Sequence, residues 1–266
     1  MNTKFRFLVL ALVVAIFSVQ CSPNSTDTPQ IPTTIEQHFK AGTHSFEGVT
    51  LPYQETTIQT SQTGKHALVV VLHGQYANGS DNKAQINQDA MIRIWHYLST
   101  NNVKAVMLAP QCSVDHAWDE RKQNSEDVTM SECLRSLIDS FINKKPNIDT
   151  SRIYIVGYSD GNEPAGGGGV WRMLSDYSDL FAGGMSVAAD PDNTISALNV
   201  AKTPVLSVKG ITDIHAVALT LDSFGDQVRD AGGTLREDIV EERTREAVCR
   251  EAFSKERLDW LMQFSK

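Results

Sequence analysis

Short, continuously apolar segments recur along this chain and are separated by longer segments with helical periodicity. Residues 66–72 read HALVVVL, and residues 152–158 read RIYIVGY. Apolar residues at successive positions are typical of strands that are buried on both faces of a parallel sheet. Further strands are predicted at 103–108, 180–188, 204–208 and 234–240, and helices at 84–99, 128–142, 219–231 and 252–264. This alternation predicts an α/β fold: a mainly parallel, twisted sheet with helices on both faces.

Length and charge narrow the class of protein. A chain of 266 residues is long enough for one large domain. It contains 24 Lys and Arg against 32 Asp and Glu, which gives a net charge of −8. Nucleic-acid binding needs a concentrated basic face, and no long run of Lys or Arg occurs in the sequence. We therefore expect no nucleic-acid partner.

The first twenty residues have the pattern of an export signal. Lys4 and Arg6 precede an apolar run at 7–19 that Ser18 alone interrupts. The run is too short to span a bilayer as a helix, but it fits the apolar part of a signal peptide. Cys21 follows directly, as the acylated cysteine of a bacterial lipoprotein does, although Gln20 is not the small residue usual before it. The alternative is a cleaved signal with an incidental cysteine.

The residues after Cys21 have the composition of a solvated tether. Residues 22–36 are mostly Ser, Thr, Pro, Asn and Gln, with almost nothing to bury. We expect a signal peptide at 1–20, a lipoprotein tether at 21–44 and one folded domain at 45–266. A lipid on Cys21 would anchor that domain to a membrane, facing the periplasm or the cell surface.

Three further cysteines, Cys112, Cys133 and Cys249, fall within the expected domain. An exported protein can form disulfides, and three thiols allow at most one internal pair with one left over. Three buried free thiols are the alternative.

The segment Gly157-Tyr158-Ser159-Asp160-Gly161 is a G-x-S-x-G motif. It follows a predicted buried strand and precedes a helix predicted to begin near Gly168, which is the strand–turn–helix setting of a nucleophile elbow. The glycines permit a tight turn next to neighbouring strands. We therefore take Ser159 as the candidate nucleophile and expect it to be exposed above the sheet. The alternative is a Gly-rich loop with an incidental serine.

Two more segments supply partners for such a serine. His73-Gly74 ends the strand at 66–72, where the following backbone N–H groups help to form an oxyanion hole. The donors would be the backbone N–H groups of Gln75 and Asp160, and His73 would have a structural role. Asp213 follows the strand at 204–208, where the acid of a catalytic triad is expected. The alternative for Asp213 is a helix N-cap.

Four segments, VVVLHGQYANGSDN, VMLAPQCSVDHAW, IDTSRIYIVGYSDG and TPVLSVKGITD, occur in this order along the chain. Together they resemble the esterase, polyhydroxybutyrate-depolymerase and feruloyl-esterase-like group of α/β-hydrolases. That group is related to the prolyl-oligopeptidase superfamily and is often called phospholipase/carboxylesterase. The resemblance covers residues 45–266. It implies an α/β-hydrolase fold of about eight strands and a Ser–Asp–His hydrolase of carboxylic esters, without a cofactor or metal.

One departure from the family lies in the elbow itself. The family places a Trp or similar residue sooner after the nucleophile, whereas here Trp171 lies twelve positions after Ser159. Residues 162–166 therefore look like an insertion. It would push the next helix away from Ser159 or loop out beside it. Either arrangement would weaken the stabilisation of an oxyanion by the helix N-terminus.

A second departure removes the expected general base. The family's histidine should lie within 240–249, which reads VEERTREAVC, and its position falls on Arg245, or on Glu246 if the register slips by one. Arginine stays protonated and cannot accept the serine proton. His116 and His215 are the alternatives. His38 and His44 are assigned to the tether, and His66 and His96 to structural positions.

We expect the substrate pocket to be lined by Gly74, His116 and Trp118. Similar hydrolases line their pocket with the loops that carry these residues, and the Trp118 ring offers apolar contact. A Trp packed under a surface loop is the alternative for Trp118. The family function is an exported esterase acting on a small-molecule or polysaccharide-linked ester. The other interpretation is a catalytically impaired pseudo-hydrolase that binds an ester or carbohydrate ligand. A metal-dependent hydrolase has little support, since no metal-ligand spacing occurs.

Overall fold

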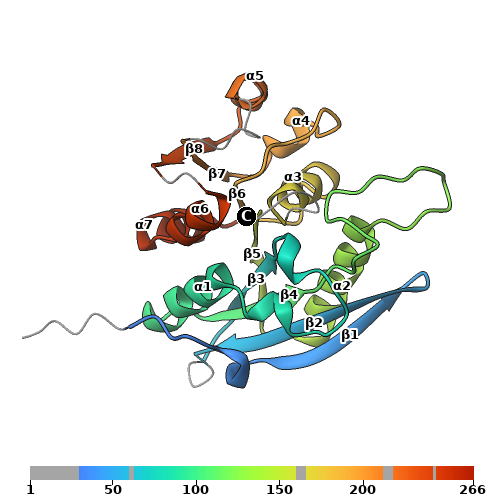
Figure 1. Cartoon of the computed structure of the whole chain (residues 1–266), viewed down its shortest axis with the longest axis vertical. Coiled ribbons are helices and arrows are strands. Elements are labelled where there is room, and N and C mark those ends of the chain that lie inside the picture. Colours follow the sequence, from blue (N-terminus) through green and yellow to red (C-terminus); the bar gives the residue numbers. More distant parts are fainter. Residues whose placement is uncertain (1–29, 60–62, 160–165, 212–217, 242–243) are drawn as a thin grey trace, which may run out of the picture. The chain divides into compact units, whose positions relative to one another are not determined.

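Eight strands form a single sheet in the order β1-β2-β4-β3-β5-β6-β7-β8 (Figure 1). The computed structural model describes residues 30–59, 63–159, 166–211, 218–241 and 244–266. The strands are β1 (Lys40–Phe46), β2 (Val49–Ile58), β3 (His66–Leu72), β4 (Ala105–Pro110), β5 (Ile148–Tyr158), β6 (Gly183–Val187), β7 (Val205–Gly210) and β8 (Leu235–Val240). β2 runs antiparallel to β1 and β4, and the other neighbours are parallel. The predicted mainly parallel sheet of about eight strands is confirmed.

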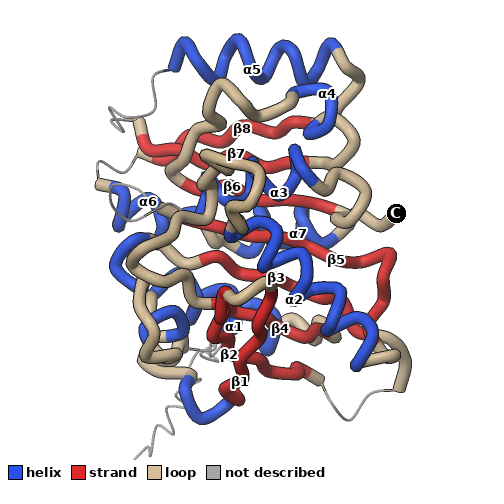
Figure 2. Tube along the Cα trace, turned by 90° about the vertical axis from the view of Figure 1, so that its right-hand side faces the viewer, coloured by secondary structure: helices blue, strands red, loops and turns tan. Residues whose placement is uncertain are grey.

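Helices cover both faces of this sheet (Figure 2). Side chains at alternate positions of β3 enter opposite layers: Val69 and Val71 pack in one core cluster, and Leu68, Val70 and Leu72 in the other. On the first face lie α1 (Asp89–Thr100), α6 (Arg245–Ala252) and α7 (Lys255–Met262). On the second lie α2 (Met130–Lys144), α3 (Gly166–Asp176), α4 (Ala197–Val200) and α5 (Ala218–Asp230).

The helix predicted at 84–99 is divided. A short 3-10 helix, η3 (Ala84–Ile86), precedes α1, and Gln88 is the N-cap residue of α1. The helix predicted at 252–264 is in fact α7 alone, because the Ser254 hydroxyl caps a new start. The range 240–249, where the resemblance placed the catalytic histidine on a loop, contains the start of α6, and Thr244 is the N-cap of that helix. The predicted histidine position, Arg245, is therefore the first residue of a helix.

The folded unit begins earlier than residue 45. Contacts within the chain group residues Ile31–Lys266 together, and Ile35, just before the 3-10 helix η1 (Glu36–His38), is fully buried. β1 starts at Lys40 and joins β2 through a two-residue turn with positive φ at both positions, Glu47 and Gly48. These two strands were missed because polar and apolar residues mix along them.

Two histidines assigned to the tether lie in this earlier part of the fold. The His38 ring stacks on Trp95, and His44 Nε2 lies 2.9 Å from Ser136 Oγ.

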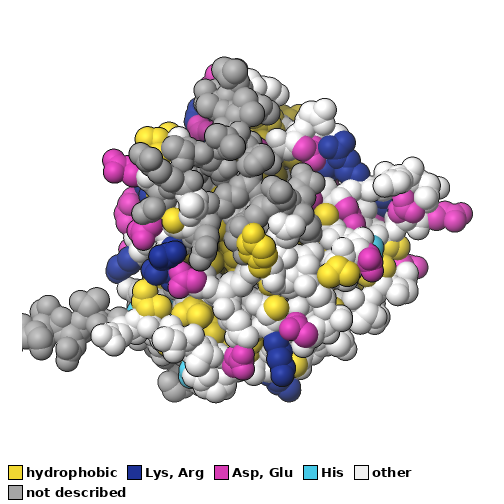
Figure 3. All heavy atoms as spheres, in the orientation of Figure 1, with side chains coloured by type: hydrophobic (Ala, Val, Ile, Leu, Met, Phe, Trp, Pro, Cys, Tyr) yellow, Lys and Arg dark blue, Asp and Glu magenta, His cyan; other side chains and the backbone are white. Residues whose placement is uncertain are grey.

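Cys112, Cys133 and Cys249 are buried and form no disulfide, in agreement with the alternative of three free thiols. Burial raises the pKa of the Cys133 thiol to about 11. None of the helices in the described ranges is long and apolar enough to cross a bilayer. On the face drawn in Figure 3, the described Lys and Arg side chains are dispersed among Asp and Glu.

Candidate active site

Ser159 lies at the carboxyl edge of the sheet, directly after β5. β5 is a central strand, paired with β3 on one side and β6 on the other. The Ser159 backbone N–H donates to the Val187 carbonyl at 3.0 Å and so extends the ladder with β6 by one residue. The predicted position of Ser159 at the end of a strand agrees with the structure.

Glycines allow α3 to start against the ends of β3 and β5. A Cβ atom on Gly157 would lie 2.0 Å from the Gly166 carbonyl oxygen, and one on Gly166 would lie 2.3 Å from the Leu72 carbonyl oxygen. Both distances are too short for any side chain. The helix begins at Gly166, two residues before the predicted start. Residues 162–165 of the proposed insertion, and Asp160 and Gly161 of the motif, lie outside the described residues.

The expectation that Ser159 is exposed is wrong, because its side chain is completely buried, with a relative exposure of 0%. The first turn of α3 packs against its strand, and the Cys249 thiol of α6 donates to the Ser159 carbonyl oxygen at 3.2 Å. An ester can therefore reach Ser159 Oγ only after neighbouring groups move.

His73 holds two loops together at the same edge of the sheet. Its Nε2 accepts the Cys112 backbone N–H at 2.9 Å, so Nδ1 carries the proton and donates to the Gly74 carbonyl at 2.7 Å. The Trp118 indole N–H donates to the His73 carbonyl at 3.2 Å. Complete burial lowers the pKa of His73 to about 4, so the ring is neutral near pH 7. This is the structural role that the sequence predicts for His73.

The candidate oxyanion loop continues into the 3-10 helix η2 (Gln75–Ala77). Gly74 N–H donates to Gln88 Oε1 at 3.4 Å, and the same oxygen accepts the Tyr158 hydroxyl. The Gln75 backbone N–H finds no acceptor among the described residues. It is therefore one donor on this loop that a substrate oxygen could use.

Gln111 fixes the far side of this loop, and sequence reasoning missed it. The side chain is fully buried: Nε2 donates to Ala77 O at 3.0 Å and to Asp81 Oδ1 at 2.7 Å, and Oε1 accepts Asn82 N–H at 2.6 Å. Such a network holds the loop in one conformation before a ligand arrives. The signal was present, since Gln111 is the polar residue that directly follows a buried strand.

His116 and Trp118 lie on the loop after β4, as expected. His116 Nδ1 is 3.0 Å from both carboxylate oxygens of Glu120, and Glu120 also accepts the Met130 backbone N–H. Trp118 is 1% exposed, with its ring edge-on to His73 at 5.2 Å between centroids. The side chain is packed under the loop, which corresponds to the alternative stated for it.

The predicted acid and base lie largely outside the described residues. Asp213, His215 and the side chains of Arg245 and Glu246 are not described, and neither is Cys21. β7 and β8 do end at the same edge as β5, and Ile211 N–H donates to the Val240 carbonyl. A carboxylate that the sequence analysis did not single out, Asp190, follows β6 and pairs with Lys209 Nζ at 2.9 Å.

Position 245 nevertheless has a defined place relative to Ser159. α6 contacts the Ser159 carbonyl through Cys249, and position 245 is four residues earlier on the same helix. Residues four apart lie on one face of a helix, one turn from each other. The backbone of Arg245 therefore belongs to the face of α6 that meets Ser159.

Comparison with solved structures identifies proteins with the same architecture. A thermostable esterase is matched with a TM-score of 0.72 and 22% identity, over 86% of this chain and 64% of that one. A ferulic acid esterase has a TM-score of 0.61 and 13% identity, over 85% of this chain and 98% of that one. S-formylglutathione hydrolase from Staphylococcus aureus has a TM-score of 0.58 and 12% identity, over 84% and 97%. No protein-family model and no curated protein matches the sequence.

Proposed function

We propose that this chain, which has the α/β-hydrolase fold, is a serine hydrolase of carboxylic esters with Ser159 as its nucleophile. Asp213 is the proposed acid, and the backbone N–H groups of Gln75 and Asp160 are the proposed oxyanion donors. Gly74 and His116 are the proposed pocket residues, and Trp118 is packed beneath the loop that carries His116 and supports it. The substrate is a small-molecule or polysaccharide-linked ester.

The observation that carries the proposal is the position of Ser159 at the centre of the carboxyl edge of the sheet. The neighbouring strand β3 leads into the Gln75 loop, and β7 ends at Gly210, three residues before Asp213. In parallel α/β sheets this edge is where ligands bind. Among the described residues, no group of three or more His, Cys, Asp or Glu side chains could hold a metal ion.

The chemistry requires a proton acceptor. Attack by Ser159 Oγ on the ester carbonyl forms the Oγ–C bond and places negative charge on the carbonyl oxygen, which the two N–H groups stabilise. The serine proton must pass to a base and then to the leaving alcohol as the C–O bond breaks; water later releases the acid. Arg245 cannot serve as that base, because its guanidinium remains protonated.

We predict that the unmodified chain hydrolyses p-nitrophenyl acetate slowly and that Arg245→His raises kcat/KM at least roughly tenfold, a small part of what a general base contributes. The N-terminus of α6 disfavours a protonated imidazole, so a histidine at 245 would remain able to accept a proton. Removal of 162–165, which keeps Gly166 at the start of α3, should add to the effect if the insertion blocks access to Ser159.

Two controls accompany this measurement. Glu246→His places the imidazole one residue away and about 100° around the helix, and Arg250→His changes a distant exposed position of α6. Neither should raise the rate. Fast hydrolysis by the unmodified chain that depends on Ser159 and on His116 or His215 would place the base elsewhere.

A second candidate function is a pseudo-hydrolase that binds an ester or carbohydrate without turnover. The observation that favours it is the complete burial of Ser159. We would prefer this function to the first if neither Arg245→His nor the 162–165 deletion, alone or combined, produces any Ser159-dependent hydrolysis.

We also propose that the protein is exported and anchored through a lipid on Cys21, because an apolar run directly precedes this cysteine. In a bacterial host fed a fatty-acid probe, we predict that the chain is labelled and that Cys21→Ala abolishes the label. Label that persists in the variant would remove the proposed anchor.

A further inference from the structure

The loop after β3 carries one backbone N–H group that a ligand could use and one that is already occupied. The Gln75 N–H finds no acceptor among the described residues, whereas the Gly74 N–H donates to Gln88 Oε1 at 3.4 Å. A peptide group is planar and almost always trans, so its N–H points away from the C=O of the same group. The contacts of the His73 and Gly74 carbonyl groups therefore decide where these two N–H groups point.

The peptide group that joins Gly74 to Gln75 is held by its carbonyl. This oxygen accepts the His73 Nδ1–H at 2.7 Å and the Ala77 N–H at 3.2 Å. The His73 ring is itself fixed, because its Nε2 accepts the Cys112 N–H at 2.9 Å on the other side. With the carbonyl held in one direction, the Gln75 N–H is held in the opposite one. This donor is therefore oriented before a ligand arrives, as an oxyanion donor must be.

The preceding peptide group, between His73 and Gly74, is held at both ends. The Trp118 indole N–H donates to its carbonyl at 3.2 Å, and Gln88 Oε1 accepts its N–H. The same Gln88 oxygen accepts the hydroxyl of Tyr158, the second residue of the G-x-S-x-G motif. Gln88 therefore joins the candidate oxyanion loop to the elbow, and Trp118 holds the same peptide group from the opposite side.

Trp118 reaches this carbonyl because glycines at the start of α3 leave room for it. A Cβ atom on Gly166 would lie 2.6 Å from the His73 carbonyl oxygen, and one on Gly169 would lie 2.5 Å from Trp118 Cβ. Both distances are too short for any side chain. The glycines at 166–169 therefore allow α3 and the loop that carries Trp118 to meet at this edge of the sheet.

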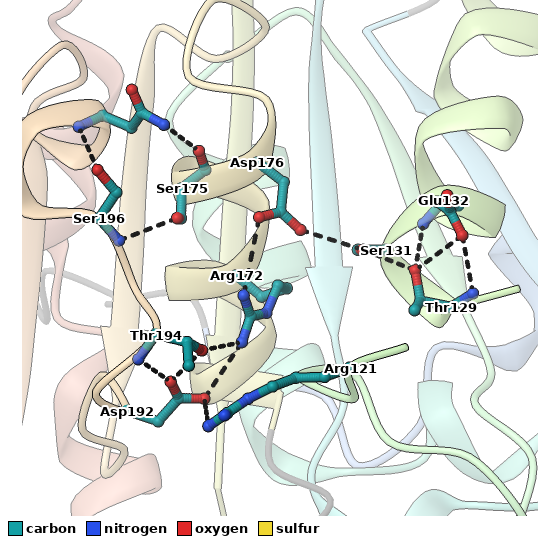
Figure 4. A network of polar contacts seen from close by, with 11 residues as sticks. Arg121, Thr129, Ser131, Glu132, Arg172, Ser175, Asp176, Asp192, Thr194 and Ser196 are labelled. Carbon is teal, nitrogen blue, oxygen red and sulfur yellow. Dashed lines mark hydrogen bonds and ion pairs between the residues drawn. The ribbon is translucent and has the colours of Figure 1, made fainter. Parts of the chain in front are cut away.

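The loop that carries Trp118 is fixed by the two residues that come next but one and next but two. Glu120 Oε1 accepts the Met130 N–H at 2.6 Å, at the start of α2. The Arg121 guanidinium pairs with Asp192 Oδ2 at 3.0 Å, on the loop after β6 (Figure 4). Contacts on two sides hold the loop in one conformation, so the Trp118 indole stays where it meets the loop after β3.

We propose that Gln88 and Trp118 are positioning residues that aim the Gln75 N–H at the oxyanion of the proposed ester hydrolysis. The inference therefore rests on the proposed function. Neither side chain takes part in the chemistry itself, because each acts through the peptide group that it holds. An oxyanion donor is effective only within about 2.7–3.1 Å of the oxyanion, so a small shift of this loop lowers the rate and leaves binding of the ester nearly unchanged.

The first test is kinetic and uses the Arg245→His chain with p-nitrophenyl acetate. Gln88→Leu and Trp118→Phe should each lower kcat by about tenfold or more, part of the loss expected when an oxyanion donor is removed, and change KM by no more than about twofold. Gln88→Glu keeps an acceptor oxygen and should retain most of kcat. The matched control is Trp171→Phe, which removes another buried indole, one that donates to the Ala189 carbonyl at 3.1 Å, and should leave kcat unchanged.

The second test does not depend on turnover. It uses the full chain carrying Ser159→Ala and follows the Gln75 backbone amide by NMR while acetate, the carboxylate product of the same ester, is added. The amide proton should shift downfield as it donates to the carboxylate, both in this chain and after Gln88→Glu. The shift should be lost after Gln88→Leu and after Trp118→Phe.

Thermal unfolding establishes that each variant is folded, and Tyr158→Phe, which removes the hydroxyl bonded to Gln88, replaces Gln88→Leu or Trp118→Phe where either is not. An undiminished kcat in both variants, an equal loss in Trp171→Phe, or an acetate shift that persists in both would overturn the inference. Absence of any acetate shift in the Ser159→Ala chain would overturn it as well. The proposed function fails separately: acetate shifts as expected, without Ser159-dependent hydrolysis in any variant, would retain the two positioning residues and reject the esterase.

Discussion

The buried histidine His73 gives the stability of the fold a pH dependence that can be assigned to one group. The folded-state pKa of His73 is about 4, below the value of about 6.5 in an unfolded chain, so the unfolded state binds the proton first as pH falls. Its contribution to stability is complete above pH 6.5 and is lost as pH falls towards 4, a total of roughly 3 kcal/mol.

We predict that the free energy of unfolding of the wild type exceeds that of His73→Gln by about 2 kcal/mol more at pH 7.5 than at pH 5.0. Urea denaturation at both values tests this, and His96→Gln controls for the loss of a histidine. A pH-independent difference would mean that His73 does not titrate in this way.

Among the helices and strands, those with a clear apolar pattern were predicted from the sequence. Those in which polar and apolar residues mix were missed. β3 has apolar residues at nearly every position, and its bounds were predicted exactly as observed because burial on both faces leaves one interpretation. β1 alternates exposed and half-buried residues, so no periodicity distinguished it from a tether. α6 was taken for a loop because resemblance placed a catalytic histidine there, whereas the Thr244 cap starts a helix at Arg245.

At the scale of the whole molecule, the order of strands brings together segments that the sequence could only place one by one. The end of β5, the loop after β3 and the end of β7 meet at one edge because β3, β5, β6 and β7 are successive parallel neighbours. Burial of Ser159 could not be predicted, since it depends on α3 and α6 packing on the elbow from opposite faces of the sheet. Gln111 could be noticed as a polar residue after a buried strand, but its partners could not be predicted, because they lie about thirty positions earlier in the chain.

We propose above all that Ser159, positioned by this fold, is the nucleophile, and that Arg245 stands where the catalytic histidine is expected. Mass spectrometry of the chain after exposure to a fluorophosphonate tests the claim most directly, because the reagent bonds covalently to an activated serine. We predict one adduct per chain, located on Ser159, that forms at least roughly tenfold faster in Arg245→His than in the unmodified chain and is absent from Ser159→Ala. An adduct on another residue, or no adduct in Arg245→His under conditions that keep it folded, would show that Ser159 is not the nucleophile.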